Sequence, residues 1–326
     1  MNKKFNRFAT LALGLALATS CFGVSGVEAA KQFKVGVCQL VEHPALDAAN
    51  KGFVDGLAKA GFKVGANLVV DQQNAQADQS NLANIAHRFV SQKVDLICAI
   101  ATPAAQTMAN ATDEIPIVGT AITDYVAAKL AKSNMQPGMN VTGTTDMNPV
   151  EAQLDMLVKF VPNIKTVGTV YSSSEVNSQL QVDILKAAAE RRGLRVKEAT
   201  VSTVNDIQQA ARSLVGQCEG IYIPTDNVVA SSVPTLLSIT DEEKIPVIVG
   251  EGSIVKGGCL GSLGVDYYTL GLQTGQMAAD ILNGKAKPQT MAIQGQKDCA
   301  AIINMKAVKT LGVKIPAEFA NAEKVQ

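Results

Sequence analysis

Two short apolar stretches, Lys34-Val35-Gly36-Val37 and Thr166-Val167-Gly168-Thr169-Val170, decide the fold, because the chain follows the same plan after each one. Both are typical of strands that are buried on both faces of a sheet. A helical segment follows each stretch, at residues 45–60 in the first case and 175–192 in the second. Apolar strands that alternate with helices predict right-handed βαβ units and parallel sheets.

The spacing of glycines supports this internal repeat. Gly61 follows Gly36 by 25 residues (61 − 36), and Gly193 follows Gly168 by 25 residues (193 − 168). A glycine just after a helix commonly ends it in the left-handed conformation. We therefore expect each helix to stop at this glycine, and the valine three residues later to open the next strand.

The repeat continues through a third and a fourth strand in each half. The third strands are expected at 94–98 and 219–223, and the fourth, each opened by a proline, at 115–119 and 245–250. The fold class is therefore α/β, with two doubly wound parallel-sheet lobes. Ligands bind beyond the carboxyl ends of the strands in open parallel sheets, so two lobes with facing ends would enclose a ligand cleft.

The composition excludes several classes of protein. The 29 basic and 29 acidic residues balance, and 47% of residues are hydrophobic. Such a chain is neither disordered nor suited to neutralising the phosphates of a nucleic acid. GxSxG, HExxH, P-loop and strand-linked GxGxxG motifs are absent from the sequence, and His43 and His87 are its only histidines. We therefore expect no enzyme activity, no cofactor and no metal site.

The first 30 residues have the pattern of a secretory signal peptide. Lys3, Lys4 and Arg7 precede an almost uncharged stretch at 8–24, and small residues follow up to Ala30. We predict export to the periplasm as a soluble protein, with lipid attachment at Cys21 as a minor alternative. Export leaves an odd number of cysteines, so at least one is free or bridges two molecules. A Cys259–Cys299 disulfide is possible but does not follow from the sequence.

Polar residues gather in the loops that follow the predicted strands. Several precede a helix, where free backbone N–H groups favour an anion such as a carboxylate. Serine, threonine and aspartate at these positions also serve as ordinary helix caps, so both interpretations stay open for each residue alone. The binding candidates are Gln39, Glu42, Thr102, Asp124, Tyr125, Tyr171, Ser174, Asn177, Ser178, Asp226, Glu251 and Asp266.

Five segments resemble the ABC-transporter substrate-binding proteins of the tryptophan/tyrosine-type uptake group. They are 39–47, 171–178 with its Ser-Glu-x-Asn-Ser core, 223–227, 264–271 and 302–316. The resemblance covers about residues 33–318 in the same order. It implies the type I periplasmic-binding fold and a monomeric exported receptor that closes on a small ligand by a hinge motion. Such a receptor delivers its ligand, often an aromatic or other apolar amino acid, to a membrane permease.

The resemblance also implies roles for the candidate residues. Asp226 would bind the ammonium group of an amino acid, and Thr102 with three residues of the 171–178 segment, Ser174, Asn177 and Ser178, would bind its carboxylate. Gln39 and Glu42 would line the first lobe, while Asp124, Glu251 and Asp266 are weaker candidates. Tyr125 stands where the family usually has proline. Without tryptophan, a stacking wall would come from Tyr125, Tyr171 or Tyr222.

In type I proteins the chain crosses between the lobes three times, which predicts a three-strand hinge. We place the crossings at 140–148, 264–266 and 287–294. Lobe I would then comprise 31–143 plus 266–288, and lobe II 144–265 plus 289–326. The alternative function on the same fold is a ligand-sensing module that signals to a receptor kinase or chemoreceptor, and the sequence does not separate the two.

Overall fold

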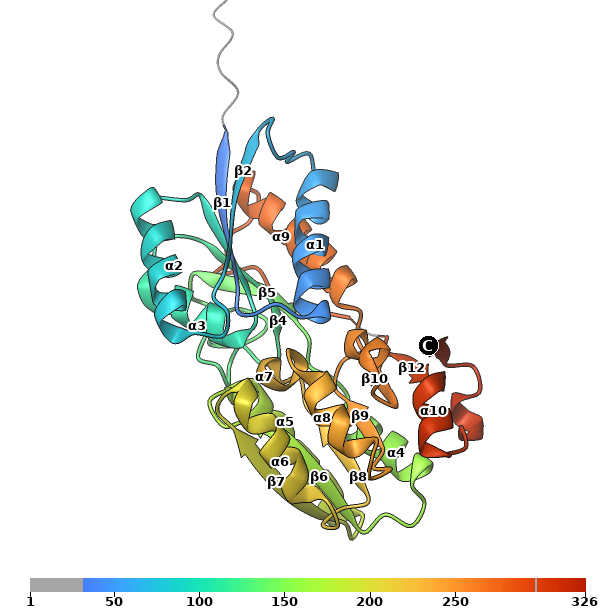
Figure 1. Cartoon of the computed structure of the whole chain (residues 1–326). Helices are drawn as coiled ribbons and strands as arrows, with labels where there is room; N and C mark the ends of the chain where they lie inside the picture. The colour runs from blue at the N-terminus through green and yellow to red at the C-terminus, as the bar shows by residue number, and fades with distance from the viewer. Residues whose placement is uncertain (1–31, 297) are drawn as a thin grey trace, which may run out of the picture. The chain divides into compact units, whose positions relative to one another are not determined.

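The computed structural model describes residues 32–296 and 298–326. The predicted signal peptide and Cys21 lie outside these residues. The described chain is mixed α/β, and its strands form two sheets, one in each lobe (Figure 1). The fold class expected from the sequence is thus confirmed.

The sheet of lobe I has six strands, and every pairing in it is parallel. Its strands, in the order in which they lie side by side, are β11 (Gln294–Gly295), β5 (Val141–Thr145), β4 (Ile117–Ile122), β3 (Leu96–Ile100), β1 (Phe33–Gln39) and β2 (Leu68–Asn74). The central strands β1, β3 and β4 are almost wholly buried, as their apolar sequences predict.

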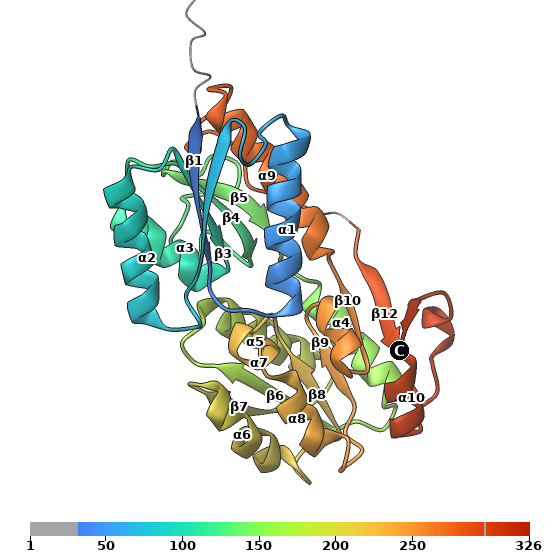
Figure 2. The ribbon, with the colours of Figure 1, turned by 45° about the horizontal axis from the view of Figure 1, so that its top comes forward.

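The sheet of lobe II has seven strands and is parallel except where β12 runs antiparallel to β10. Its order is β13 (Glu323–Val325), β12 (Ala300–Asn304), β10 (Gly261–Gly264), β9 (Val247–Val249), β8 (Gly220–Ile223), β6 (Thr166–Ser172) and β7 (Arg195–Val201). Because β13 pairs with β12, the C-terminus ends at the edge of this sheet (Figure 2).

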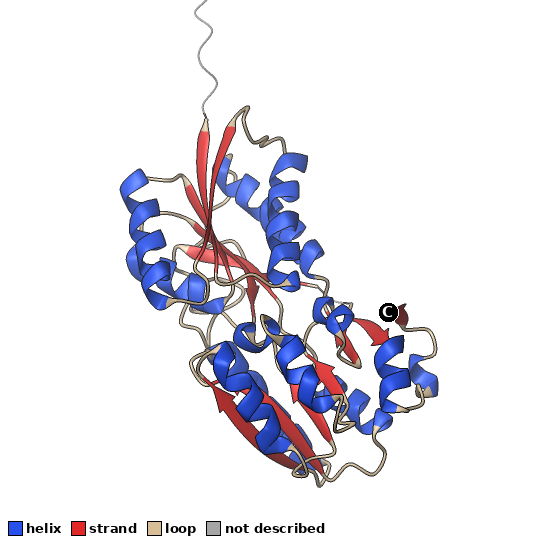
Figure 3. Ribbon diagram, viewed as in Figure 1, coloured by secondary structure: helices blue, strands red, loops and turns tan. Residues whose placement is uncertain are grey.

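Helices cover both faces of each sheet (Figure 3). In lobe I, α1 (Pro44–Lys59) packs with α9 (Tyr267–Leu282), and α2 (Gln79–Gln92) packs with α3 (Thr102–Ala111). In lobe II, α4 (Val150–Phe160) packs with α5 (Val176–Arg191), and α6 (Ile207–Leu214) packs with α8 (Val233–Thr240). The remaining helical segments are α7 (Asn227–Ala230), α10 (Met305–Leu311), η1 (Val204–Asp206), η2 (Ser253–Gly257) and η3 (Ala317–Phe319).

The predicted repeat is present, with one difference between the halves. Gly61 and Gly193 follow α1 and α5 with φ of +97° and +67°, as expected for glycines that end a helix. Strand β7 includes the predicted valine, but β2 begins at Leu68 rather than at Val64. A turn delays β2, because the Asn67 side chain accepts a hydrogen bond from the Lys63 amide and donates one to the Gly61 carbonyl.

Helix α9 returns to lobe I late in the sequence because glycines let its backbone touch α1. A Cβ atom at Gly52 would lie 2.1 Å from the Tyr268 carbonyl oxygen, and one at Gly271 would lie 2.1 Å from the Ala49 carbonyl oxygen. Real Cβ atoms do not approach so closely, so these positions require glycine. The contact holds the start of α9, which follows the second crossing, against the start of α1.

Three segments connect the two sheets among the described residues: the one after β5, the one between β10 and α9, and the one between β11 and β12. The first two lie within the predicted crossings. Because β11 pairs with β5, the sheets favour a third crossing after Gly295, later than the predicted 287–294. The exact lobe boundaries remain a prediction.

The cysteines are unpaired within the part of the chain that the structure describes. Cys38, Cys98, Cys218 and Cys259 are buried, and Cys299 is half-buried. Burial raises the pKa of the Cys38 thiol to about 12, so this cysteine behaves as a small apolar residue. None of the helices in residues 32–296 and 298–326 is both long and apolar enough to span a membrane.

Candidate functional site

A cavity of about 330 Å³ lies at the carboxyl ends of the strands in both sheets. Its position is the one where open parallel sheets bind ligands. Lobe I and the crossing segments contribute His43, Leu46, Ala121, Thr123, Asp146 and Tyr267. Lobe II contributes Asn177, Pro224, Thr225, Asp226, Asn227, Ala230, Glu251 and Ile254.

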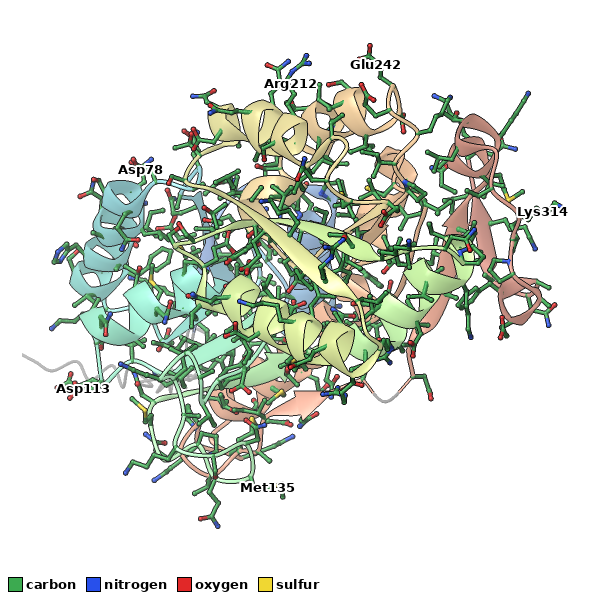
Figure 4. All side chains as sticks on the ribbon, turned by 90° about the horizontal axis from the view of Figure 1, so that it is seen from below. Asp78, Asp113, Met135, Arg212, Glu242 and Lys314 are labelled. Atoms are coloured by element: carbon green, nitrogen blue, oxygen red, sulfur yellow. The ribbon has the colours of Figure 1, made fainter. Side chains whose placement is uncertain are left out.

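Buried carboxyl groups distinguish the cavity from the rest of the molecule. Charged side chains such as Asp78, Arg212 and Glu242 are exposed at the surface (Figure 4). By contrast, four acidic residues at the cavity are at most 3% exposed: Asp146, Glu175, Asp226 and Glu251. Among the described residues that line the cavity, none is lysine or arginine. The described lining is therefore acidic, and no lysine or arginine in it balances the carboxyl groups.

Asp226 is held by its own lobe. It is the N-cap of α7, and one carboxyl oxygen accepts a hydrogen bond from the Val229 amide at 2.9 Å. The other oxygen accepts from the Ser172 amide at 2.6 Å and the Ser178 hydroxyl at 2.7 Å. Burial raises the pKa of Asp226, while these three donors favour the charged form and lower it.

Glu175 lies behind the cavity wall and orders it. Its carboxyl group accepts hydrogen bonds from the backbone amides of Asn227 and Val228, at 3.1 and 3.2 Å to Oε1. It also accepts from the side-chain amide of Asn177 at 3.0 Å. Burial, followed by the charge of Asp226, raises the pKa of Glu175 to about 8. Glu175 thus joins α5 to α7 and fixes the side chains that face the cavity.

Asp146 and Glu251 form a second acidic pair, near the crossing segments. Asp146 accepts hydrogen bonds from the Thr123 hydroxyl at 3.0 Å and the Tyr267 hydroxyl at 2.5 Å. Glu251 Oε2 accepts a long hydrogen bond of 3.4 Å from Ser253, whereas Glu251 Oε1 has no partner among the described residues. Burial, and then the charge of Asp146, raises the pKa of Glu251 to about 8. A cation placed here would relieve the repulsion.

The two lobes touch across the cavity. The Thr123 hydroxyl of lobe I lies 3.3 Å from the Thr225 hydroxyl of lobe II. His43 Nε2 of lobe I lies 3.3 Å from Asn227 Oδ1 of lobe II. These contacts join residues far apart in the sequence and place the lobes in a closed arrangement.

The lobe I wall is shaped by unusual backbone. Ala101 and Ala121, at the ends of β3 and β4, have φ of +85° and +57°. Such conformations are strained for a residue with a Cβ atom and gather at functional sites. Thr102 follows Ala101 as the first residue of α3, is 2% exposed, and its hydroxyl has no hydrogen-bond partner within residues 32–296 and 298–326. A helix start with a free hydroxyl suits an anion.

Of the candidates chosen from the sequence, the structure places Asn177, Asp226 and Glu251 on the cavity, with Ser178 bonded to Asp226 behind it. Others face elsewhere. Glu42, Ser174 and Asp266 are exposed, and Asp266 caps α9. Gln39 is bonded to Val41, Asp47 and Asn50, and Asp124 accepts from the amides of Val126 and Ala127. These five do not line the cavity, and neither does Thr102.

The three tyrosines expected to form a stacking wall are bonded outside the cavity. The Tyr125 hydroxyl donates to the carbonyls of Gly119 and Thr144 inside lobe I. Tyr171 donates to Glu198, and Tyr222 to Gln153. Among the described residues, Tyr267 is the tyrosine that lines the cavity.

Sequence reasoning missed several lining residues by one position. His43 adjoins Glu42, Thr123 adjoins Asp124, and Tyr267 adjoins Asp266. The sequence identified the correct loops but not the correct residues in them. Which side chain of a loop faces the cavity depends on the backbone conformation at the end of each strand. Asp146 lies inside a predicted crossing and could have been singled out as an acidic residue there.

Comparisons with known proteins agree with this geometry. A model of the ABC transporter substrate-binding protein family matches residues 34–325. The chain belongs to this family. A tyrosine-binding protein of Clostridioides difficile (strain R20291) is 40% identical over 311 residues, which is 93% of this chain and 90% of that protein. These homologues are substrate-binding proteins, which act outside the cytoplasm in ABC importers, and they favour uptake over the sensing alternative.

Two solved structures of family members show which conformation the chain adopts. A Streptococcus pneumonia ABC domain in complex with L-Trp is 38% identical, covers 91% of this chain and 100% of that chain, and has a TM-score of 0.87. The ligand-free, open structure of a Clostridium difficile substrate-binding protein with adhesive properties is 46% identical, covers 90% and 99%, and has a TM-score of only 0.69. The C. difficile protein thus has the higher sequence identity to this chain but the lower structural similarity. By this measure the structure is nearer to the ligand complex than to the open, ligand-free structure.

Proposed function

We propose that this protein captures an aromatic amino acid between its lobes and delivers it to the membrane permease of an ABC importer. The observation that carries the proposal is the buried acidic cavity, whose lining includes no lysine or arginine among the described residues. An ammonium group is the cation that an amino acid would bring. A tyrosine-binding relative and an L-Trp complex in the same family support an aromatic ligand.

The hydrogen bonds favour Glu251, with Asp146, as the site of the ammonium group. Glu251 Oε1 has no donor within the described chain, whereas both oxygens of Asp226 already accept from lobe II. Asp226 is the ammonium anchor expected from the resemblance. In this proposal it instead supports ligand binding indirectly, because it holds Ser172, Ser178 and Val229 of lobe II in place. The resemblance assigns the carboxylate group to Thr102, whose hydroxyl is free among the described residues but which does not line the cavity in this closed form. Tyr267 would provide a surface for the aromatic ring.

We further propose that residues 1–30 direct export and are removed, and that the mature protein works as a periplasmic monomer. The basic start, apolar stretch and small-residue end of this segment support export. We propose that the protein binds its ligand without changing it chemically. The support for this is that its relatives are binding proteins.

Isothermal titration calorimetry tests the proposal. The purified protein is freed of bound ligand by unfolding and refolding, then titrated with L-tyrosine, L-tryptophan, L-phenylalanine, L-leucine and adenosine. We expect an aromatic amino acid to bind. At a ligand concentration of about 100 times the dissociation constant, it should raise the free energy of unfolding by about 2.7 kcal/mol. Glu251→Gln should weaken binding about 100-fold, since it removes one partner of a buried charge pair.

The control variant is Glu42→Gln, which changes the same chemical group at an exposed position. Its affinity should equal that of the unmodified protein. If none of the amino acids binds, the proposal is wrong. If Glu42→Gln weakens binding as much as Glu251→Gln does, the ammonium group is not bound at Glu251.

A further inference from the structure

Besides Glu251 Oε1, two buried acceptors on the cavity wall have no donor. They are His43 Nδ1 and Asn177 Oδ1, on residues that are 6% and 5% exposed. Neither atom has a hydrogen-bond partner in residues 32–296 and 298–326. A buried acceptor without a donor costs free energy, so the pair needs an explanation.

The hydrogen bonds of Asn227 determine the protonation of His43. The Asn227 side-chain nitrogen donates to Glu175, so the Asn227 oxygen is the atom that faces His43 Nε2. Nε2 must therefore carry the proton. Burial lowers the pKa of His43 to about 4, so the ring is neutral and Nδ1 holds a lone pair. His43 is also the N-cap of α1, yet its side chain makes no capping hydrogen bond.

Asn177 is oriented in a similar way. Its side-chain nitrogen donates to Glu175 Oε2 at 3.0 Å, to the Thr225 carbonyl at 2.9 Å and to the Ser178 hydroxyl at 3.3 Å. These acceptors fix which end of the amide is nitrogen. Asn177 Oδ1 is thus an acceptor by necessity, and exchanging the two ends would place the oxygen against Glu175.

We infer that His43 Nδ1 and Asn177 Oδ1 form a subsite for a hydrogen-bond donor at the tip of the ligand side chain. The subsite would select a tyrosine hydroxyl or a tryptophan indole N–H over the bare ring of phenylalanine. This inference rests on the proposed function, because it deepens the choice of amino acid. Asn177 of the subsite and Asn227, the partner of His43, are both bonded to Glu175, whereas Glu251 lies beside the charge of Asp146. The side-chain subsite and the ammonium subsite are therefore served by different acidic pairs.

The known ligands of the relatives are consistent with this selection. The C. difficile relative is a tyrosine-binding protein, and the streptococcal structure contains L-Trp. Tyrosine and tryptophan both carry a donor on the aromatic side chain, and phenylalanine carries none. A site built to bond such a group rejects an analogue that lacks it, because the buried polar atoms are then left unpaired.

Matched ligand pairs test the inference on the unmodified protein. Calorimetric titrations compare L-tyrosine with L-phenylalanine, and L-tryptophan with 1-methyl-L-tryptophan, which lacks the N–H. We expect the donor-bearing member of the better-bound pair to bind at least about 10-fold more tightly. Equal affinities within both pairs would overturn the inference while leaving the proposed function standing. Binding by no amino acid would instead reject the proposed function.

Histidine variants then separate the two ring nitrogens. His43→Gln keeps a donor near the Nε2 position and loses the Nδ1 acceptor, whereas His43→Asn can place an acceptor near Nδ1 and loses the donor. We expect His43→Gln to reduce the affinity ratio within the pair at least about 5-fold, and His43→Asn to retain more of it. His87→Gln, at the exposed histidine, should keep the full ratio. An unchanged ratio in His43→Gln would overturn the inference, and the ligand pairs decide it alone if that variant does not fold.

Discussion

The two walls of the cavity differ in how their polar groups are held. On the lobe II wall, Asp226 and Asn177 are bonded within their own lobe, to Ser172, Ser178 and Glu175. On the lobe I wall, the Thr123 hydroxyl makes its side-chain contacts outside the lobe I sheet, with Asp146 and with Thr225 and Gln181 of lobe II. Leu46 and Ala121 complete that wall with apolar surface.

This difference indicates the order of events during ligand capture. The lobe II wall keeps its hydrogen bonds whether the lobes are open or closed, so it is organised before the ligand arrives. The contacts of Thr123 with Thr225 and Gln181 join the two lobes, so we expect them to form only on closure. We therefore expect a ligand to meet lobe II first and closure to add the lobe I wall, a hinge motion in which the closed state is selected by extra contacts. The following predictions test this comparison, from the largest expected effect to the smallest.

The largest effect should come from Asp226→Ala, which removes the centre of the lobe II wall. It leaves the Ser172 and Val229 amides and the Ser178 hydroxyl, all buried, without their acceptor. Because each unsatisfied buried donor costs about 1–3 kcal/mol, the free energy of unfolding should fall by about 4 kcal/mol. Urea unfolding of the ligand-free protein measures it.

Asp266→Ala is the matched control, since Asp266 is also an N-cap aspartate but is exposed. It should cost about 1 kcal/mol, the usual value of a helix cap. Equal losses for the two variants would mean that the lobe II wall is no more organised than an ordinary helix end.

The fold was predictable because it rests on local patterns. Apolar strands, helices and glycine stops recur within about 25 residues of each other, and the stretches 34–37 and 166–170 lie in strands β1 and β6. β11 escaped prediction because Gln294-Gly295 has no apolar pattern, and its pairing with β5 comes from tertiary contact alone.

The site was less predictable because it depends on backbone detail and long-range contacts. The pairing of β4 with β5 shifts register between Gly119 and Ile122, which disturbs the alternation of side chains just before Thr123. Thr123 rather than Asp124 therefore lines the cavity. Glu175 was part of a recognised motif, but its partner Asn227 lies 52 residues away, and no spacing rule connects them.

An intermediate effect should appear in the pH dependence of stability. Glu251 has a pKa of about 8 in the folded protein, above its ordinary value of 4.5, so the folded state holds a proton that the unfolded state has lost between these values. Stability contributed by this group therefore falls as pH rises, by up to about 1.4 kcal/mol per pH unit. His43, whose pKa is lowered to about 4, acts in the opposite sense only below pH 6.5.

Urea unfolding between pH 6.5 and 8 measures the effect of the buried carboxyl groups, to which Glu175, whose pKa is also raised to about 8, contributes beside Glu251. The ligand-free protein should lose stability across this range, and Glu251→Gln, which has no proton to lose, should show a flatter dependence. Glu42→Gln should match the unmodified protein. A Glu251→Gln profile as steep as the original would show that other groups cause the slope, and would remove Glu251 from the account of the acidic cavity.

The smallest effect should come from Thr123→Val, because the contacts of Thr123 across the lobes, with Thr225 and Gln181, are neutral and are expected only in the closed form. The substitution keeps the shape but removes the hydroxyl that contacts Thr225 and Asp146. Losing the neutral contacts made at closure should cost about 1 kcal/mol, or about 5-fold in ligand affinity. Losing the Asp146 bond within lobe I should cost the ligand-free protein far less than Asp226→Ala does. Small-angle X-ray scattering with saturating ligand should still show closure, whereas calorimetry shows the weaker affinity.

The control variant is Thr200→Val, at an exposed position in β7, which should bind the ligand as the unmodified protein does. If Thr123→Val instead destabilises the ligand-free protein as strongly as Asp226→Ala does, the lobe I wall is organised before closure, and the distinction between the two walls does not hold.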